Sequence, residues 1–188
     1  QQLKDYDVSS YCYRHSRRDW KVSAYDKGYG INYDGDSRKP EYLIDGEKKT
    51  NWSSGKINDK PLELPYYIIF DLNKVSDIDG VYLANGYSNQ CLADVHVEYI
   101  GSEVADPYDI NAPWETLLQV TDPNVVRANL KNERFFDCPR TQARYLRLKI
   151  SNPNTIVFKS DSDLTEEEKA NQKKYHSFAE FGTYYKKP

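Results

Sequence analysis

Apolar residues recur along this chain with the two-residue period of β-strands. Residues 93–100 and 143–150 alternate apolar with polar side chains, which places the apolar ones on one face of an extended segment. Residues 66–72 (YYIIFDL) are apolar on both faces, as expected for a strand buried between two layers. Further strands are expected at 77–85, 114–120, 134–138 and 177–185.

The composition favours the same fold class. The chain contains 17 Tyr, and its Val, Ile and Phe residues gather in short runs between turn residues, which is typical of strands. No alternation of strands with helices is visible, so the pattern argues against a parallel α/β sheet. We therefore predict an all-β fold, an antiparallel β-sandwich or jelly roll. A length of 188 residues with 38% hydrophobic content predicts one domain over residues 1–188.

One segment departs from the strand pattern. Residues 160–175 are highly charged and nearly free of apolar side chains. Thr165 and Glu168 have the spacing of a capping box, with acidic residues before lysines, as the helix dipole favours. The pattern predicts a short exposed helix inserted before the last strand. A solvated loop is the alternative, because no apolar stripe would hold a helix against the sheet.

Charge and motif content exclude several functions. The net charge is −3, and the densest basic group, Arg14, Arg17 and Arg18, is what a solvated face or an N-terminal arm would carry. A nucleic-acid partner needs a larger basic surface. The serine-hydrolase, zinc-protease, P-loop and dinucleotide motifs are all missing, so the sequence predicts no enzyme. No run approaches the roughly 20 apolar residues that cross a bilayer.

The three cysteines leave the disulfide state open. Cys12, Cys91 and Cys138 allow at most one internal disulfide and leave one thiol over. They form no C-x-x-C pair and have no histidine at ligand spacing, which argues against zinc.

Residues 43–52 (LIDGEKKTNW) are rich in oxygen ligands. An Asp-Gly turn brings carboxylates, a hydroxyl and backbone carbonyls into ten residues. Ca²⁺ takes about six to eight oxygen ligands, including carbonyls that a tight glycine turn can aim inward. The alternative is a surface turn that Trp52 anchors to the core. The residues alone leave both interpretations open.

Seven segments follow one another in an order typical of one family: WKVSA at 20–24, LIDGEKKTNW at 43–52, YYIIFDL at 66–72, DIDGVYL at 77–83, VHVEYIGS at 95–102, ARYLRLKI at 143–150 and SFAEFGTYY at 177–185. Together they resemble the discoidin or coagulation factor V/VIII C-type domain family over residues 20–185. The resemblance implies an eight-stranded antiparallel jelly-roll sandwich, similar to galactose-binding domains, that binds ligands without catalysis. No cysteine lies near the C-terminus to close the disulfide usual in animal members, so bacterial family 32 carbohydrate-binding modules resemble the chain more closely.

The resemblance also implies a structural calcium ion. In the bacterial branch, a D-G-D-x-x-T-x-W loop and a glutamate of the last strand hold it. Asp45 matches the first acid, Thr50 the hydroxyl and Glu180 the closing glutamate. Glu47 replaces the second acid, and its longer side chain leaves open whether it would bind through its carboxylate or its carbonyl. Such an ion would join an early loop to the last strand and so close a long chain loop.

The ligand site implied by the resemblance lies in loops. In similar modules the loop before the VHVEYIGS-like strand contacts the sugar, and here it contains Asn85, Tyr87 and Asn89. An aromatic ring can stack on a pyranose while the amides bind its hydroxyls. Tyr29 and Tyr33, in an earlier glycine-rich loop, are a second candidate pair. The arginine or histidine that many members carry in the first loop is missing, so a standard galactose site is not specified.

Two partner classes follow from these observations. The first is a glycan, such as one of galactose type, bound weakly by a monomeric, calcium-containing module. The second is a cell-surface protein or a lipid headgroup, bound by an adhesion module. The candidate loops are polar and rich in tyrosine, which argues against membrane insertion. Either function predicts an extracellular or cell-surface location, such as a periplasmic or outer-membrane lipoprotein of a bacterium.

Overall fold

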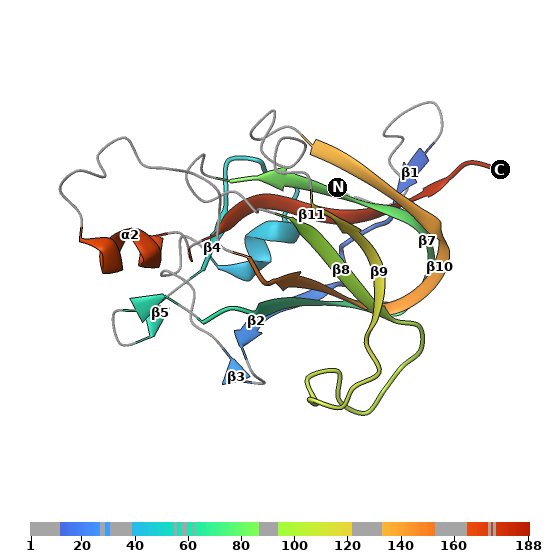
Figure 1. The fold of residues 1–188 in the computed structure, drawn as a ribbon. Coiled ribbons are helices and arrows are strands. Elements are labelled where there is room, and N and C mark those ends of the chain that lie inside the picture. Colours follow the sequence, from blue (N-terminus) through green and yellow to red (C-terminus); the bar gives the residue numbers. More distant parts are fainter. Residues whose placement is uncertain are drawn as a thin grey trace.

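The computed structural model describes residues 12–26, 29–30, 39–54, 56–57, 60–61, 63–86, 94–121, 133–152, 165–172, 174 and 176–188. They form a mostly β architecture with one short α-helix and one 3-10 helix (Figure 1). The elements, in chain order, are β1 Cys12–Arg14, β2 Lys21–Asp26, β3 Tyr29–Gly30, η2 Pro40–Ile44, β4 Trp52–Ser53, β5 Lys56–Ile57, β6 Lys60–Pro61, β7 Tyr66–Asn85, β8 Val95–Ile100, β9 Glu115–Val120, β10 Glu133–Ile150, α2 Glu166–Gln172 and β11 Ser177–Lys186.

The main sheet is antiparallel and has the strand order β1-β11-β7-β10-β8-β9. β2 pairs with the first half of β7, β3 with β2, and β4 with the start of β11. β5 and β6 form a separate two-stranded sheet. The expected antiparallel all-β fold is therefore confirmed.

The sheet curls because its two longest strands bend, as Figure 1 shows for β7 and β10. The first half of β7 pairs with β2 and the end of β10, whereas the second half pairs with the start of β10 and with β11. Register shifts interrupt the β7–β10 ladder between Asp137 and Thr141 and between Ala143 and Tyr145. Each long strand thus runs from one layer of the sandwich into the other.

This continuity corrects two of the expected strand boundaries. Residues 66–72 and 77–85 were expected as two strands, as were 134–138 and 143–150, but each pair belongs to one bent strand. Asn73, Lys74 and Val75 at the bend of β7 are exposed, and Asn73 has a φ of 69°. An exposed stretch that begins Asn-Lys and has one left-handed residue has the features of a turn, although β7 continues as one strand that pairs with β10 on both sides of it.

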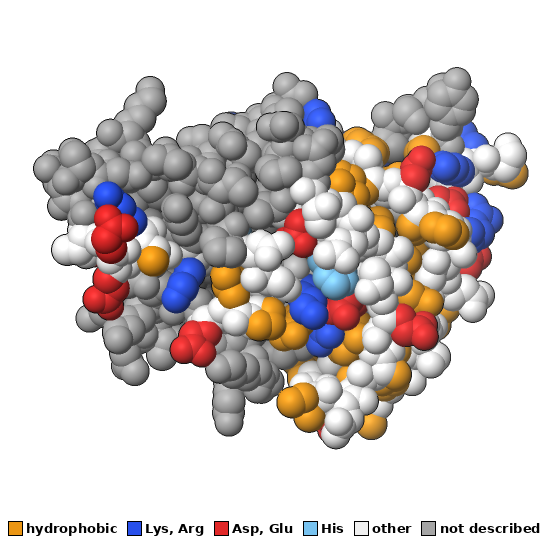
Figure 2. Space-filling view, in the orientation of Figure 1, with side chains coloured by type: hydrophobic (Ala, Val, Ile, Leu, Met, Phe, Trp, Pro, Cys, Tyr) orange, Lys and Arg blue, Asp and Glu red, His pale blue; other side chains and the backbone are white. Residues whose placement is uncertain are grey.

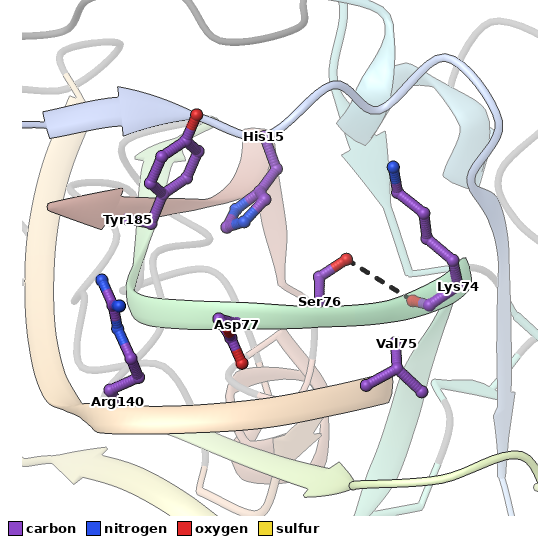
Figure 3. Close-up of a pocket in the computed structure, with 7 residues that line it drawn as sticks. All are labelled: His15, Lys74, Val75, Ser76, Asp77, Arg140 and Tyr185. Carbon is purple, nitrogen blue, oxygen red and sulfur yellow. Dashed lines mark hydrogen bonds between the residues drawn. The ribbon is translucent and has the colours of Figure 1, made fainter. Parts of the chain in front are cut away.

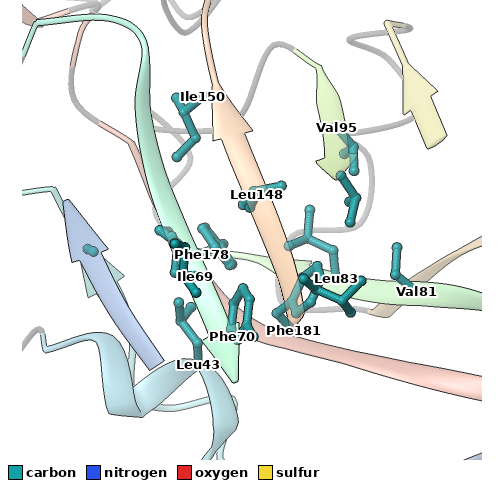
Figure 4. Close-up of a cluster of buried hydrophobic side chains, with 14 of the residues drawn as sticks. Leu43, Ile69, Phe70, Val81, Leu83, Val95, Leu148, Ile150, Phe178 and Phe181 are labelled. Atoms are coloured by element: carbon teal, nitrogen blue, oxygen red, sulfur yellow. The ribbon is translucent and has the colours of Figure 1, made fainter. Parts of the chain in front are cut away.

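The core lies between the layers (Figure 4). Phe70 of β7 and Phe181 of β11 stack with ring centroids 4.3 Å apart. Leu43 of η2 and Trp52 of β4 are fully buried against the same core, so residues 43–52 are anchored at both ends. Full burial of each such side chain contributes about 1.5–3 kcal/mol.

A glycine in β11 makes room for a buried tyrosine. A Cβ at Gly182 would lie 2.2 Å from the ring of Tyr82, which sits opposite it on β7. Only glycine therefore lets β7 and β11 pair with the Tyr82 ring packed over the ladder. That ring, 1% exposed, contacts Arg14 and Arg17, which belong to the site described below.

The expected helix near residues 160–175 is present as α2, at the left edge of Figure 1. The capping box forms as predicted: the Glu168 N–H donates to Thr165 Oγ1 at 3.1 Å, and the Thr165 N–H donates to Glu168 Oε1 at 3.4 Å. Helices long and apolar enough to span a bilayer do not occur in the described part of the chain.

Candidate functional site

Three of the predicted metal-site residues meet in one loop, residues 45–50, which we call the Asp45 loop. Asp45 follows η2, and Gly46 has the positive φ of 79° that the turn requires. The Glu47 N–H donates to Asp45 Oδ1 at 2.8 Å. The Thr50 hydroxyl lies 2.5 Å from Asp45 Oδ2 and 3.1 Å from the Glu47 carbonyl. The Glu47 backbone, rather than its exposed side chain, therefore joins Asp45 and Thr50.

The fourth predicted residue, Glu180, is buried in β11 and binds an arginine. Its side chain is 3% exposed, and Oε2 accepts a hydrogen bond from Nη1 of Arg17 at 2.7 Å. The same nitrogen donates to the carbonyls of Leu43 at 3.1 Å and Phe181 at 3.0 Å. Burial raises the pKa of Glu180 above its usual range, and the positive charge of Arg17 opposes that rise.

The position of Arg17 corrects a sequence-based expectation. A solvated face or arm was expected for the arginines at 14, 17 and 18, and Arg18 is indeed exposed, but Arg17 is 4% exposed. The sequence feature that could have predicted the burial of Arg17 is Trp20, three residues later. The backbone N–H of Trp20 donates to the Arg17 carbonyl at 3.2 Å, and the buried Trp20 ring packs on the core. A large apolar residue so close to the basic group indicates that this segment folds onto the sandwich.

Further charges surround this pair. Arg14 forms a bidentate ion pair with Glu133 of β10, with Nη2 to Oε1 at 2.9 Å, and Lys48 lies 3.6 Å from the same carboxylate. Arg14 and Arg17 both lie over the Tyr82 ring, at 4.5 and 5.5 Å from its centroid. Glu133 and Glu180 therefore each have at least one cationic partner.

These residues fit a calcium ion only in part. Asp45, Thr50 and the Glu47 carbonyl supply hard oxygen ligands of the kind that Ca²⁺ prefers. The Glu180 oxygen that faces Arg17 is already used by a guanidinium. Among the described residues, no three carboxylate, imidazole or thiol side chains are grouped as a metal site. Calcium binding stays a prediction from the resemblance.

The predicted ligand loop is described only where it begins. Asn85 ends β7 with its side chain 2% exposed, and the Gly86 N–H donates to the Ser177 carbonyl at 3.3 Å. Tyr87, Asn89 and Tyr33 lie outside the described residues. Tyr29 is described by its backbone alone, which pairs with Asp26. The ligand-binding roles of these residues therefore stay predictions.

A pocket of about 340 Å³ lies at the bend of β7 (Figure 3). The second half of β7 runs from this bend to Asn85, so the pocket and the predicted ligand loop lie at opposite ends of that half. The rings of His15 and Tyr185, 4.9 Å apart, form one wall. Lys74 and Arg140 line the pocket too, and Arg140 is held by Asp79 in a bidentate pair at 2.8 and 3.0 Å. Sequence reasoning did not find this pocket, because its residues come from four segments and share no motif.

The visible surface carries mixed charge. Acidic and basic side chains are interspersed on the described part of the face in Figure 2, without a broad patch of one sign. Some charged side chains pair across strands, as Arg147 of β10 does with Glu98 of β8 at 2.7 Å. The Arg147 guanidinium also lies between the rings of Tyr67 and Trp114, 4.2 and 4.5 Å from their centroids. The described part of this face therefore forms no broad basic surface of the kind that nucleic acid requires.

Comparison with known proteins gives one family match and many structural ones. The family model of the F5/8 type C domain matches residues 21–160. A search of curated protein sequences finds no match. The C-terminal domain of a chitobiase from Bacteroides fragilis is 19% identical, with a TM-score of 0.59, over 93% of this chain and 97% of that one.

Two further similar structures are of sugar-binding modules. CpGH89CBM32-5 from Clostridium perfringens, in complex with GalNAc-β-1,3-galactose, is 15% identical over 87% of this chain and 94% of that one, with a TM-score of 0.57. A chitosan-binding module from Paenibacillus sp. IK-5 is 14% identical over 88% and 93%, with a TM-score of 0.58. At these identities the likeness establishes a shared fold.

Proposed function

This chain belongs to the F5/8 type C domain family, and from that membership we propose that it is a non-catalytic carbohydrate-binding module. The family match over residues 21–160 is the observation that carries the proposal. The fold neighbours support it, because they include modules named for the sugars they bind, and this chain spans nearly their whole length. An extracellular or cell-surface location follows from the same function.

The proposed glycan site is the loop that begins at Asn85. Backbone pairing places the end of β7 beside the start of β11, through Asn85 and Phe178, and beside the start of β10, through Ala84 and Glu133. Loops that meet at one end of a rigid sandwich are common binding sites. In this site Tyr87 stacks on the sugar ring and Asn89 binds its hydroxyls, while the buried Asn85 holds the base of the loop.

Binding by such a loop is expected to be weak. Each hydroxyl contact replaces a hydrogen bond to water and contributes about 0.5–1.5 kcal/mol net. A few contacts with one stacked ring therefore give a Kd from about millimolar to high micromolar. NMR titration with galactose, N-acetylgalactosamine, glucose and chitosan oligosaccharides suits this range.

Replacing Tyr87 tests the location of the site. Tyr87→Ala should weaken glycan binding at least about tenfold, because it removes the stacking surface. The matched control is Tyr108→Ala, which removes a tyrosine that is 40% exposed in the β8–β9 connection and should leave binding unchanged. Equal binding by the Tyr87 variant and the wild type would place the site elsewhere, and chemical-shift changes at Tyr185 would point to the pocket at the β7 bend.

A protein-interaction role is the second candidate, favoured by one observation. Ile110 is 93% exposed and lies two residues from the exposed Tyr108. Exposed apolar side chains of this kind can serve as contact points for a partner protein. Failure of every glycan to bind, together with loss of cell-surface attachment in Ile110→Ser, would favour this function.

The calcium ion remains a prediction of the resemblance and is tested in the same samples. If Ca²⁺ binds at Asp45, Thr50 and Glu180, chelation should lower the melting temperature of the protein. The contacts of Arg17 indicate a different cation, its guanidinium, for the role of joining residues 43–52 to β11.

A further inference from the structure

We infer that the Arg17 guanidinium is the cation that joins residues 43–52 to β11, so that this connection does not depend on a divalent metal ion. The inference concerns the scaffold and does not depend on which ligand the module binds. It rests on the contacts of Arg17, on the charges around it and on the way the chain holds it in place.

A single nitrogen of Arg17 donates hydrogen bonds to oxygens from two distant parts of the chain. Nη1 lies 2.7 Å from Glu180 Oε2, 3.0 Å from the Phe181 carbonyl and 3.1 Å from the Leu43 carbonyl. Leu43 lies just before the Asp45 loop, and Glu180 and Phe181 lie in β11. A carboxylate and two carbonyls around one positive centre are the ligands that a hard cation would use.

The Arg17–Glu180 pair is removed from water. Both side chains are 3% exposed, so an uncompensated charge on either one would be costly. A carboxylate paired with a guanidinium at 2.7 Å has its charge compensated within the protein. Glu180 therefore needs no metal ion to be buried.

A calcium ion on Glu180 would also lie close to Arg17. Ca²⁺ binds carboxylate oxygens at about 2.3–2.6 Å, which would leave it within roughly 5 Å of Nη1 if it used the same oxygen. Two cations at that separation repel each other. The carboxylates of this cluster already have cationic partners, because Arg17 pairs with Glu180 while Arg14 and Lys48 pair with Glu133.

The Asp45 loop is also closed by its own hydrogen bonds. The Asp45 carboxylate accepts from the Glu47 N–H and from the Thr50 hydroxyl, so both of its oxygens have partners. Its turn is thus fixed by contacts within the chain.

The chain holds Arg17 in place from both sides. Two residues earlier, the His15 N–H donates to the Thr183 carbonyl of β11 at 3.0 Å, and the His15 Nδ1 lies 2.9 Å from Thr183 Oγ1. Three residues later, the ring of Trp20 packs edge-on against Phe70, with centroids 6.1 Å apart. A segment anchored on each side loses little further backbone entropy when the arginine enters the core.

The test compares melting temperatures of the metal-stripped full chain in excess EGTA and in excess CaCl₂. We expect the two values to agree for the wild type. A calcium ion present at a hundred times its Kd would instead raise the melting temperature by roughly 5–10 °C. A rise of that size with CaCl₂, reversed by EGTA, would overturn the inference.

Charge variants test the role of Arg17 itself. Arg17→Gln should lower the melting temperature by about 10 °C, because it leaves Glu180 buried without a partner. Arg18→Gln, the matched control, removes an exposed arginine and should have little effect. Arg17→Lys should keep more stability than Arg17→Gln, because it keeps the charge.

A double variant keeps the test decisive if Arg17→Gln does not fold. Arg17→Gln with Glu180→Gln removes both charges and should recover most of the lost stability. An equal loss in Arg17→Gln and Arg18→Gln, or a double variant less stable than Arg17→Gln, would contradict the assignment.

Discussion

His176 is a buried titratable residue whose protonation should couple folding to pH. Its ring is fully buried, with Nε2 2.9 Å from the Asn152 carbonyl and Nδ1 2.5 Å from the Tyr66 hydroxyl. Burial lowers the pKa of His176 from 6.5 to about 4, although the neighbouring carbonyls oppose the shift. The imidazole is therefore neutral in the folded protein at neutral pH.

This burial predicts a loss of stability in mild acid. Between pH 6.5 and 4 the unfolded chain binds a proton on His176 that the folded chain does not, so stability falls as the pH falls through this window. The contribution of His176 to this loss should reach about 3 kcal/mol, obtained from urea unfolding of the wild type and of His176→Gln at each pH. His176→Gln should flatten this pH dependence and His96→Gln, in a partly exposed position, should not. Parallel curves for the wild type and His176→Gln would contradict the account.

The site residues differ in how far sequence reasoning could reach. Asp45, Glu47 and Thr50 meet within one loop because an Asp-Gly turn has strong local rules. Arg17 and Glu180 are separated by 163 positions, and no local pattern pairs them. Local turns can be predicted from residue types, whereas a contact across the whole chain depends on how the strands assemble.

At the scale of elements, α2 is an addition to the sandwich rather than part of it. Residues 165–168 are exposed, and the helix is held by its capping box and by the Glu166–Lys169 pair at 3.4 Å. Such surface pairs contribute little to stability. Lys174 is different, because its carbonyl lies 3.1 Å from Nδ1 of the buried His176.

Replacing residues 165–172 with a Gly-Ser linker should therefore change the melting temperature by no more than a few degrees. The substitution removes little buried apolar area. Differential scanning fluorimetry of the variant beside the wild type measures the effect, with His176→Gln as a variant that disturbs the adjacent core. A fall as large as that of the His176 variant would mean that α2 packs on the sandwich.

The strands show where periodicity is informative and where it is not. The alternation at 93–100 and 143–150 predicted β8 and the end of β10 as strands, although the polar residues Glu98 and Arg144 are buried there as well. Residues 66–72 and 77–85 were expected as two strands because the segment between them breaks the apolar pattern, whereas the structure shows one bent strand whose residues 73–75 are exposed. Side-chain pattern reports burial, and an exposed stretch of a continuous strand has the pattern of a loop.

At the scale of the whole molecule, two properties define this module. Membership of the F5/8 type C domain family supports glycan binding by loops at one end of the sandwich. The buried Arg17–Glu180 pair supports a scaffold that closes without a metal ion. Together they predict a module whose glycan binding and melting temperature do not change when a chelator is added.

A glycan array, probed with the full chain in EGTA and again in CaCl₂, tests this account most directly. We predict binding to a restricted set of glycans, with the same set and the same relative signals in both buffers. Binding to no glycan in either buffer would contradict the proposed function. Binding that appears only with calcium would support the carbohydrate-binding role and contradict the assignment of Arg17 as the cation of the scaffold.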